Sequence, residues 1–289
     1  MTRRLTGPFL VRALQTCDRE IARALPRVLR SADDEAVHDL RVGIRRMRVL
    51  LKLARPIFGR HYADVVRAAY TIVHRSTGDL RDAEVLLTTL GELAIQDAAF
   101  TVWLAMRKRR EVGLRKTVVR GLMTGDLSRA SDRLRALLLL PINPARDKLL
   151  AKFARQSVGR AHETVTQRDT ADTTDVLGLH ALRIAYKGLR YAAEVLAIAL
   201  PPHFGACAEA AAKFQKRLGE IHDLDVAVVV VRRARGLPLD VKNAAIVALG
   251  ARRERVVAKL LAEPKILLPR KPADQPKSEA RVSAPIITP

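Results

Sequence analysis

The sequence predicts an all-α protein made of two repeated halves. Apolar residues recur at helical spacing along most of the 289 residues, and turn-forming proline and glycine separate the periodic segments. Residues 37–51 (V-H-D-L-R-V-G-I-R-R-M-R-V-L-L) recur as residues 179–193 (L-H-A-L-R-I-A-Y-K-G-L-R-Y-A-A). Residues 75–86 recur, at nearly the same offset, as residues 216–227. Each half is therefore expected to form one complete helical unit.

Within each half the expected order is a helix, a signature helix, a short turn, a helix, a G-[DE]-x-[RH]-D turn and an apolar helix. Early breaks are expected at Pro8, at Pro26 and from Pro56 to Gly59, and Pro141–Pro144 divides the halves. The candidate N-caps are Asp33 or Asp34 for the first signature helix and Thr174 or Asp175 for the second. The predicted units are residues 1–140 and 141–263.

Two apolar segments and the C-terminus need separate interpretation. Residues 226–231 (V-A-V-V-V-V) have a strand-like composition, but their counterpart, residues 85–90, follows the same turn and no second strand is available to pair with them. Both segments are therefore expected to be helical. Residues 264–289 are rich in proline and basic residues, which predicts a flexible basic tail.

Each signature segment carries a row of cations that begins with a histidine. On a helix the first row falls within an arc of roughly 100° and comprises His38, Arg41, Arg45, Arg48, Lys52 and Arg55. The second row comprises His180, Arg183, Lys187 and Arg190, with Glu194 where Lys52 stands in the first. A solvated helix face usually mixes charges to form i,i+4 pairs, whereas Asp39 is the one acid between His38 and Arg55. The rows therefore indicate a bound anion.

The four repeated motifs resemble those of a CHAD domain, the conserved histidine α-helical domain. They are V-H-D-L-R-V-G-I-R-R-M-R, L-H-A-L-R-I-A-Y-K-G-L-R-Y, S-T-G-D-L-R-D-A-E-V and L-G-E-I-H-D-L-D-V, and the likeness extends from about residue 5 to 262. The resemblance implies two four-helix bundles related by a pseudo-two-fold, with a basic surface or pore between them that binds inorganic polyphosphate. It adds Arg75, Arg81, Lys216 and His222 to the predicted binding residues. His222 departs from the pattern, because Arg81 stands there in the first half and the family usually has arginine.

Composition independently favours a polyanion as the partner. The net charge is +22, the sequence pI is about 11.0, and 4% of residues are aromatic. Such a charge attracts polyanions from a distance, while 48% hydrophobic residues suffice to bury one or two cores. Arginine outnumbers lysine, which suits phosphate contacts, although a GC-rich genome would produce the same bias.

The remaining features limit the cell compartment and the chemistry. Cys17 and Cys207 lack metal or redox spacing and fit a reducing cytosol. We find no apolar run long enough to cross a membrane and no secretory signal, so a cytoplasmic protein is expected. No metal or other cofactor is predicted.

Several residues have competing interpretations. His38 and His180 are either structural hydrogen-bonding residues or phosphate contacts, and the phosphate role is preferred because each begins a cationic row. Arg46 is expected at the surface, and Tyr191 either packs or donates its hydroxyl. Asp82 and Asp223 are expected to cap helices or to orient Arg81 and His222, rather than to act as general acids.

The preferred function is binding of inorganic polyphosphate without catalysis, with attachment to a granule surface as a further hypothesis. Phosphoryl transfer by the His-Arg clusters is one alternative, but the sequence has neither a P-loop nor the glutamate motif of triphosphate tunnel enzymes. Nonspecific nucleic-acid binding is another alternative. It explains the charge but leaves the repeated histidine unexplained, and stacking aromatics are scarce.

Overall fold

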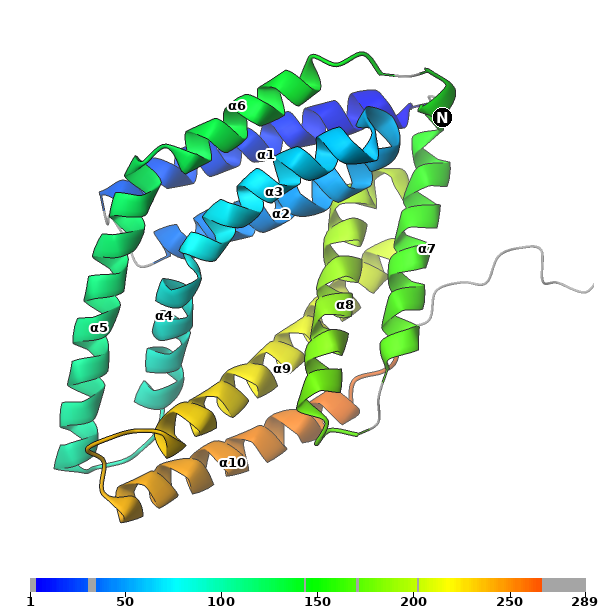
Figure 1. Ribbon diagram of the computed structural model, residues 1–289. Helices are drawn as coiled ribbons and strands as arrows, with labels where there is room; N and C mark the ends of the chain where they lie inside the picture. The colour runs from blue at the N-terminus through cyan, green and yellow to red at the C-terminus, as the bar shows by residue number, and fades with distance from the viewer. Residues whose placement is uncertain (1–3, 31–34, 143, 170–171, 202, 267–289) are drawn as a thin grey trace, which may run out of the picture.

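The computed structural model describes residues 4–30, 35–142, 144–169, 172–201 and 203–266. These residues form ten α-helices, two short 3-10 helices and one isolated β-bridge, so the all-α prediction is confirmed (Figure 1). The first 140 residues hold α1 (Thr6–Leu29), α2 (Ala36–Phe58), α3 (Arg60–Ser76), α4 (Gly78–Gly91), α5 (Ala98–Met123) and α6 (Asp126–Leu138). The later helices are α7 (Leu150–Arg168), α8 (Val176–Leu196), α9 (His203–Arg232) and α10 (Leu239–Leu261).

The signature segments form α2 and α8, and both helices bury an apolar row beside the cationic row. In α2 the buried row includes Leu40, Ile44, Met47 and Leu51, all without solvent exposure. This spacing of three and four residues places one side of the helix in the core. The neighbouring row of cations then lies at the edge of that core, with Arg41 buried.

The ends of these helices agree in part with the expected caps. Asp175 caps α8 as predicted, because its carboxylate accepts a hydrogen bond of 2.9 Å from the amide of Gly178. Asp33 and Asp34 lie outside the described residues. Pro26 does not end α1, which continues to Leu29, while α2 ends at Phe58 before Gly59, whose φ of 88° suits a residue without a Cβ.

The predicted glycine turn is present in the first half and absent from the second. Thr77 separates α3 from α4, whereas the corresponding Leu218 lies inside the continuous helix α9. The prediction of a turn at Gly219 is therefore wrong. The Thr77 hydroxyl donates to the His74 carbonyl over 3.0 Å and offers the backbone an alternative to the helical pattern. Its counterpart, Leu218, is apolar and 2% exposed, so the helix continues. Residues 226–231 are helical, as expected.

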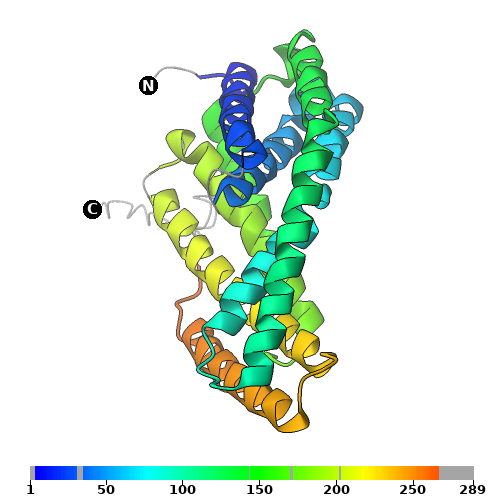
Figure 2. The ribbon, with the colours of Figure 1, turned by 90° about the vertical axis from the view of Figure 1, so that its left-hand side faces the viewer.

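The hydrophobic core has two clusters, and α5 contributes to both. Phe100 and Trp103 near its start pack with residues of α7 to α10, whereas Val118 and Leu122 near its end pack with α1, α2, α3 and α6. Figure 2 shows α5 running along the molecule between these two regions. Packing therefore crosses the repeat boundary near residue 140. The pseudo-two-fold relation between the halves stays a prediction.

Contacts far apart in sequence join the beginnings of the two repeats. Leu5 and Leu149 form the antiparallel bridge, and the Thr6 hydroxyl donates to the Lys148 carbonyl over 2.7 Å. At the other end of α7, the ring of His162 lies 2.8 Å from the carbonyl oxygen of Ile266. The first residues of the predicted tail are thus packed against the fold, and residues 267–289 lie outside the described part of the chain.

Candidate functional site

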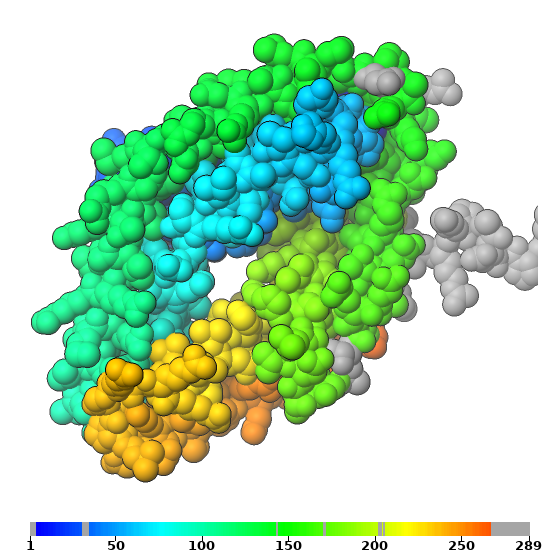
Figure 3. Space-filling view, viewed as in Figure 1, coloured from blue at the N-terminus to red at the C-terminus, as the bar shows by residue number. Residues whose placement is uncertain are grey.

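A cavity of about 1340 Å³ lies between helices of the two halves. Its lining comes from α2, α3 and α4 of the first half and from α7, α8 and α9 of the second. The space-filling view shows an opening at this position, between the cyan, yellow and yellow-green segments (Figure 3). Both signature helices therefore border the same space, although their sequences are far apart.

Nearly all of the predicted binding residues line this cavity. They are His38, Arg41, Arg45, Arg48, Lys52, Arg81, His180, Arg183, Lys187, Lys216 and His222. Arg75 and Arg190 are not among the lining residues. Arg75 is exposed on α3, whereas the guanidinium of Arg190 donates to Glu194 over 2.6 Å and to Gln215 over 3.4 Å. Glu194 stands where Lys52 stands in α2, which explains why the second cationic row is shorter.

Hydrogen bonds to neutral groups fix two of the arginines. One terminal nitrogen of the Arg41 guanidinium donates hydrogen bonds to the carbonyl of His74 at 2.9 Å and to the hydroxyl of Thr77 at 2.8 Å. Arg45 of α2 donates to the hydroxyl of Tyr191 of α8 at 3.1 Å, so this bond joins the two halves. Tyr191 is also 3% exposed and belongs to the packed interior of α8. Of the two roles expected for Tyr191, packing is therefore observed, and in this bond its hydroxyl accepts.

Several buried nitrogens in the cavity lack a hydrogen-bond partner. They are Nε of Arg41, Arg48 and Arg183, and Nε2 of His74. A buried polar atom that is not hydrogen-bonded costs on the order of 1–3 kcal/mol, and more when the group is charged. In the described part of the chain, Arg41, Arg45, Arg48, Arg183 and Lys187 also form no salt bridge. These five cations therefore lie in the site without a direct carboxylate partner.

Carboxylates stand near the cavity, but they are fewer than the cations. Asp82, Asp223 and Glu220 contribute to its lining. The carboxylate that holds Arg81 is Glu84, at 3.2 Å, and not Asp82 as expected. His222 instead packs beside His180, with ring centroids 5.3 Å apart. Burial raises the pKa of Asp223, while Arg183 and Lys187 act in the opposite direction.

Lys187 is the lysine that this environment affects most. Burial, followed by repulsion from the nearby guanidinium groups of Arg183 and Arg45, lowers its pKa from 10.5 to about 7. Burial, followed by repulsion from Arg45, likewise lowers the pKa of Arg41 to about 10. A negative ligand would reverse the repulsive part of both effects.

The histidines resist protonation for the same reason. Burial and then Arg81 lower the pKa of His38, and burial followed by Arg183 lowers that of His180. Burial and Arg183 lower the pKa of His222 to about 4, and burial with Arg41 lowers that of His74 to about 3. Without a bound anion these rings are mostly neutral at pH 7.

The repeated motifs did not predict four basic residues of the lining: Arg67, His74, Arg160 and Arg168. His74 belongs to no repeated pair, because its counterpart is Gln215. Arg160 and Arg168 lie eight residues apart with Thr164 between them, so they share a face of α7. That spacing indicates a shared cationic face on α7. The repeated motifs do not include these residues, so the repeat alone did not identify them.

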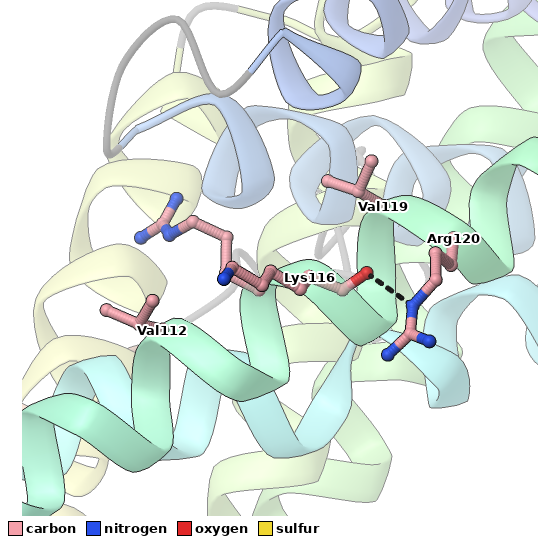
Figure 4. A pocket seen from close by; sticks show the side chains of 5 residues that line it. Val112, Lys116, Val119 and Arg120 are labelled. Carbon is pink, nitrogen blue, oxygen red and sulfur yellow. Dashed lines mark hydrogen bonds between the residues drawn. The ribbon is translucent and has the colours of Figure 1, made fainter.

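A second hollow, on α5, has different chemistry. It measures about 670 Å³ and is lined by Val112, Arg115, Lys116, Val119 and Arg120. Figure 4 shows these side chains projecting from one helix, with Arg120 donating to the Lys116 carbonyl over 3.5 Å. No histidine and no repeated motif contributes to this lining. The cavity between the halves is therefore the candidate site.

The described residues offer neither a metal site nor a membrane-spanning helix. Among the described residues no group of three or more His, Cys, Asp or Glu side chains is arranged to hold a metal ion. Every described helix also falls short of the length and apolarity that crossing a bilayer requires.

The fold and the cavity define a class of helical protein in which two copies of one helix, α2 and α8, place their cations in a shared cavity. The chain belongs to the CHAD domain family, whose model matches residues 12–232. The solved CHAD domain from the plant Ricinus communis is similar to it, with 24% identity and a TM-score of 0.65, covering 89% of this chain and 87% of that one. PptA from Streptomyces chartreusis is 19% identical with a TM-score of 0.66, covering 88% and 96%. At these identities the likeness concerns the fold. No curated protein matches the sequence significantly.

Proposed function

We propose that this protein binds inorganic polyphosphate in the cavity between its halves and does not cleave it. The observation that carries the proposal is the meeting of both signature rows in one cavity whose central cations have no carboxylate partner. Mutual repulsion among these cations disfavours the empty site. A polyanion relieves that repulsion and supplies acceptors for the buried nitrogens.

The spacing of the cations suits a linear chain of phosphates. Cations one helical turn apart are separated by roughly 5.4 Å along each helix. Successive cations can therefore contact successive phosphate groups of one polyanion. Arg41 and Arg45 are held in place by hydrogen bonds before any ligand arrives. Binding then orders fewer side chains, which favours affinity.

Nucleic acid fits the cavity less well. The aromatic side chains in its described lining, apart from the histidines, are Phe153 and Tyr191, which are 6% and 3% exposed. Neither can present a face for stacking a base, which is the usual source of affinity for single strands. A duplex carries its phosphates on the outside of a stiff cylinder, and a thin flexible chain enters a cavity of about 1340 Å³ more readily.

Binding without turnover follows from the distribution of charge. The cations extend along two helices instead of converging on one phosphorus atom, so they hold a chain along its length. Incubation with long-chain polyphosphate should release no orthophosphate and leave the chain length on a gel unchanged. Shortening of the chain that requires the cavity residues would overturn this part of the proposal.

Competition between polyphosphate and duplex DNA at moderate salt tests the main proposal. Unlabelled polyphosphate should displace labelled DNA at phosphate concentrations where unlabelled DNA fails to displace labelled polyphosphate. The matched variants are Arg41→Gln with Arg45→Gln in the cavity and Lys116→Gln with Arg120→Gln on exposed α5. Equal competition by DNA, or equal losses in both variants, would refute a specific polyphosphate site.

We further propose that binding places the protein on polyphosphate-rich granules of the bacterial cytosol. Support for this location comes from the same cavity, since a granule surface presents many polyphosphate chains. Co-sedimentation with purified granules should require Arg41 and Arg45. Retention of the cavity variant on granules would contradict this location as a consequence of polyphosphate binding.

A further inference from the structure

One row of α8 that lines the cavity consists mostly of small residues. Its lining members are Ala181, Ile184, Ala185, Gly188 and Ala192. Gly188 is exposed, and a Cβ added there would meet no atom within 4 Å. This side of α8 therefore leaves space beside the cationic row that begins at His180.

The facing side of α7 carries cations and hydroxyl groups. Arg160, Thr164 and Arg168 are exposed and line the same cavity, and the buried Ser157 lies at the inner end of this row. Arg160 donates to the Ser157 hydroxyl over 3.5 Å, and within the described residues neither Arg160 nor Arg168 has a carboxylate partner. The two arginines are about 12 Å apart along the helix axis.

The equivalent space in the first half is closed. Arg46 stands where α8 has Gly188 and forms a salt bridge of 3.5 Å with Glu20 of α1. Asp39 stands where α8 has Ala181 and pairs with Arg27 at 2.6 Å.

Packing seals the same face near its middle. Gly43 of α2 lies so close to Ile21 of α1 that a Cβ would come within 2.8 Å of its side chain. Neither Arg46 nor Gly43 lines the cavity.

We propose that the α7 groove, defined by Arg160, Thr164, Arg168 and Gly188, is a one-sided extension of the anion site that binds the part of a long polyphosphate chain leaving the cavity. This inference rests on the proposed polyphosphate function. A short phosphate oligomer occupies the central cations Arg41, Arg45, Arg183 and Lys187, whereas a longer chain also reaches α7. The groove thus makes the site selective for long chains, and it gives the chain one direction of exit.

The test compares tripolyphosphate with long-chain polyphosphate for Arg160→Gln with Arg168→Gln. We expect long-chain affinity to fall roughly tenfold at low salt, because two partly exposed contacts are lost. Tripolyphosphate affinity should stay as in the wild type. The matched control is Lys152→Gln with Arg155→Gln, which removes two exposed cations of α7 that do not line the cavity.

A second pair of variants tests the groove from the other side. Gly188→Glu places a carboxylate between α8 and the arginines of α7 and should weaken long-chain binding, whereas Gly188→Gln, of the same size, should weaken it less. Helical circular dichroism confirms that each variant is folded.

The outcomes separate this inference from the proposed function. Equal loss for both ligands, or equal loss in the Lys152 and Arg155 control, would refute the groove while central binding survives. A wild-type protein that binds neither polyphosphate, or binds DNA as well, would refute both.

Discussion

Polyphosphate binding should take up about one proton at Lys187 near pH 8. In the free protein the pKa of this lysine is about 7, so at pH 8 roughly a tenth of the molecules carry the proton. A bound phosphate chain opposes Arg183 and Arg45 and returns the pKa toward its ordinary value of 10.5. Each binding event near pH 8 then captures about 0.9 proton.

The magnitude follows from this linkage. Because the bound form holds more protons than the free form, affinity rises as the pH falls. With a pKa of about 7 in the free state and full recovery in the complex, Lys187 alone lowers affinity about tenfold from pH 6 to pH 8, and about fiftyfold from pH 7 to pH 9. Incomplete recovery, caused by the burial that persists in the complex, reduces these factors.

Calorimetry in two buffers of different ionisation enthalpy counts the protons directly at constant ionic strength. Lys187→Arg replaces the lysine with the residue that its counterpart position, Arg45, already has. This variant should bind without a pH dependence between pH 7 and pH 9 and should be the tighter binder at pH 8. Lys52→Arg, an exposed lysine of the same lining, is the control and should keep the wild-type profile.

Absence of proton uptake at pH 8 in the wild type, or an unchanged profile in Lys187→Arg, would refute the reasoning. The histidines contribute at lower pH. Since the pKa values of His38 and His180 are depressed in the free protein, their replacement by glutamine should flatten the profile below about pH 6.5 and leave the part above pH 7. An unaltered acidic limb would assign these histidines a structural role.

Further predictions concern affinity, salt and stability. Arg41→Gln with Arg45→Gln should cost about a hundredfold or more in polyphosphate affinity by direct titration, whereas Lys116→Gln with Arg120→Gln on α5 should cost only a few fold, since exposed charges are screened; equal losses would indicate diffuse attraction. The logarithm of affinity should fall linearly with the logarithm of salt between about 50 and 200 mM with a slope of several units, and a slope near one would mean a single phosphate contact. Thermal melts should show stability rising with pH from about 7 to 10.5, because the unfolded state binds a proton at Lys187 that the folded state does not. Stability should fall as the pH drops below 6.5, because His74 and His222 stay neutral in the folded state while the unfolded state takes up protons there. Added polyphosphate should raise the melting temperature most at acidic pH, and a melting temperature independent of pH would contradict these shifts.

Two other basic residues, Arg252 and Arg253, are unsuitable as controls because of their contacts in the fold. Arg252 and Arg253 are consecutive arginines of α10 that the sequence alone presents as ordinary surface charges. In the fold Arg253 donates to Asp225 over 2.6 Å and to the Thr173 carbonyl over 2.9 Å, and Arg252 pairs with Glu92. Their removal would disturb the packing of α10 and could not isolate electrostatics. Lys116 and Arg120, on the exposed side of α5, serve better.

The repeated motifs allowed much of the site to be predicted, because repetition marks residues that both halves need. His38 with His180, and Arg41 with Arg183, were found in this way and lie in one cavity. Arg190 was misplaced because its neutralisation depends on Glu194 and Gln215, and a pattern of cations does not reveal which of them has a partner. Arg160 and Arg168 were missed since only the fold brings α7 to the cavity.

Local propensity explains the errors in the helical boundaries. The glycine motif was expected to form a turn twice, but Gly219 lies within α9 because Leu218 packs in the core and offers no competing hydrogen bond. Thr77, with its hydroxyl on the His74 carbonyl, divides the helix in the first half. A glycine alone costs a helix only about 1 kcal/mol, so the neighbouring residue decides whether the helix continues.

The two copies of the motif differ in how their cations are held and in how they are charged. Thr77 and the His74 carbonyl hold Arg41, whereas the counterpart of Thr77 is Leu218, so Arg183 has no such hydrogen bonds. Where the first half has Arg45 and Arg81, the second has Lys187 and His222. Their pKa values of about 7 and about 4 leave Lys187 partly neutral and His222 almost entirely neutral at pH 7. At these two positions the first half therefore supplies permanent charge, whereas the second half has groups that gain their charge when a polyanion binds. Under the proposed function, the second half contains both Lys187, the expected source of pH dependence above pH 7, and the α7 groove.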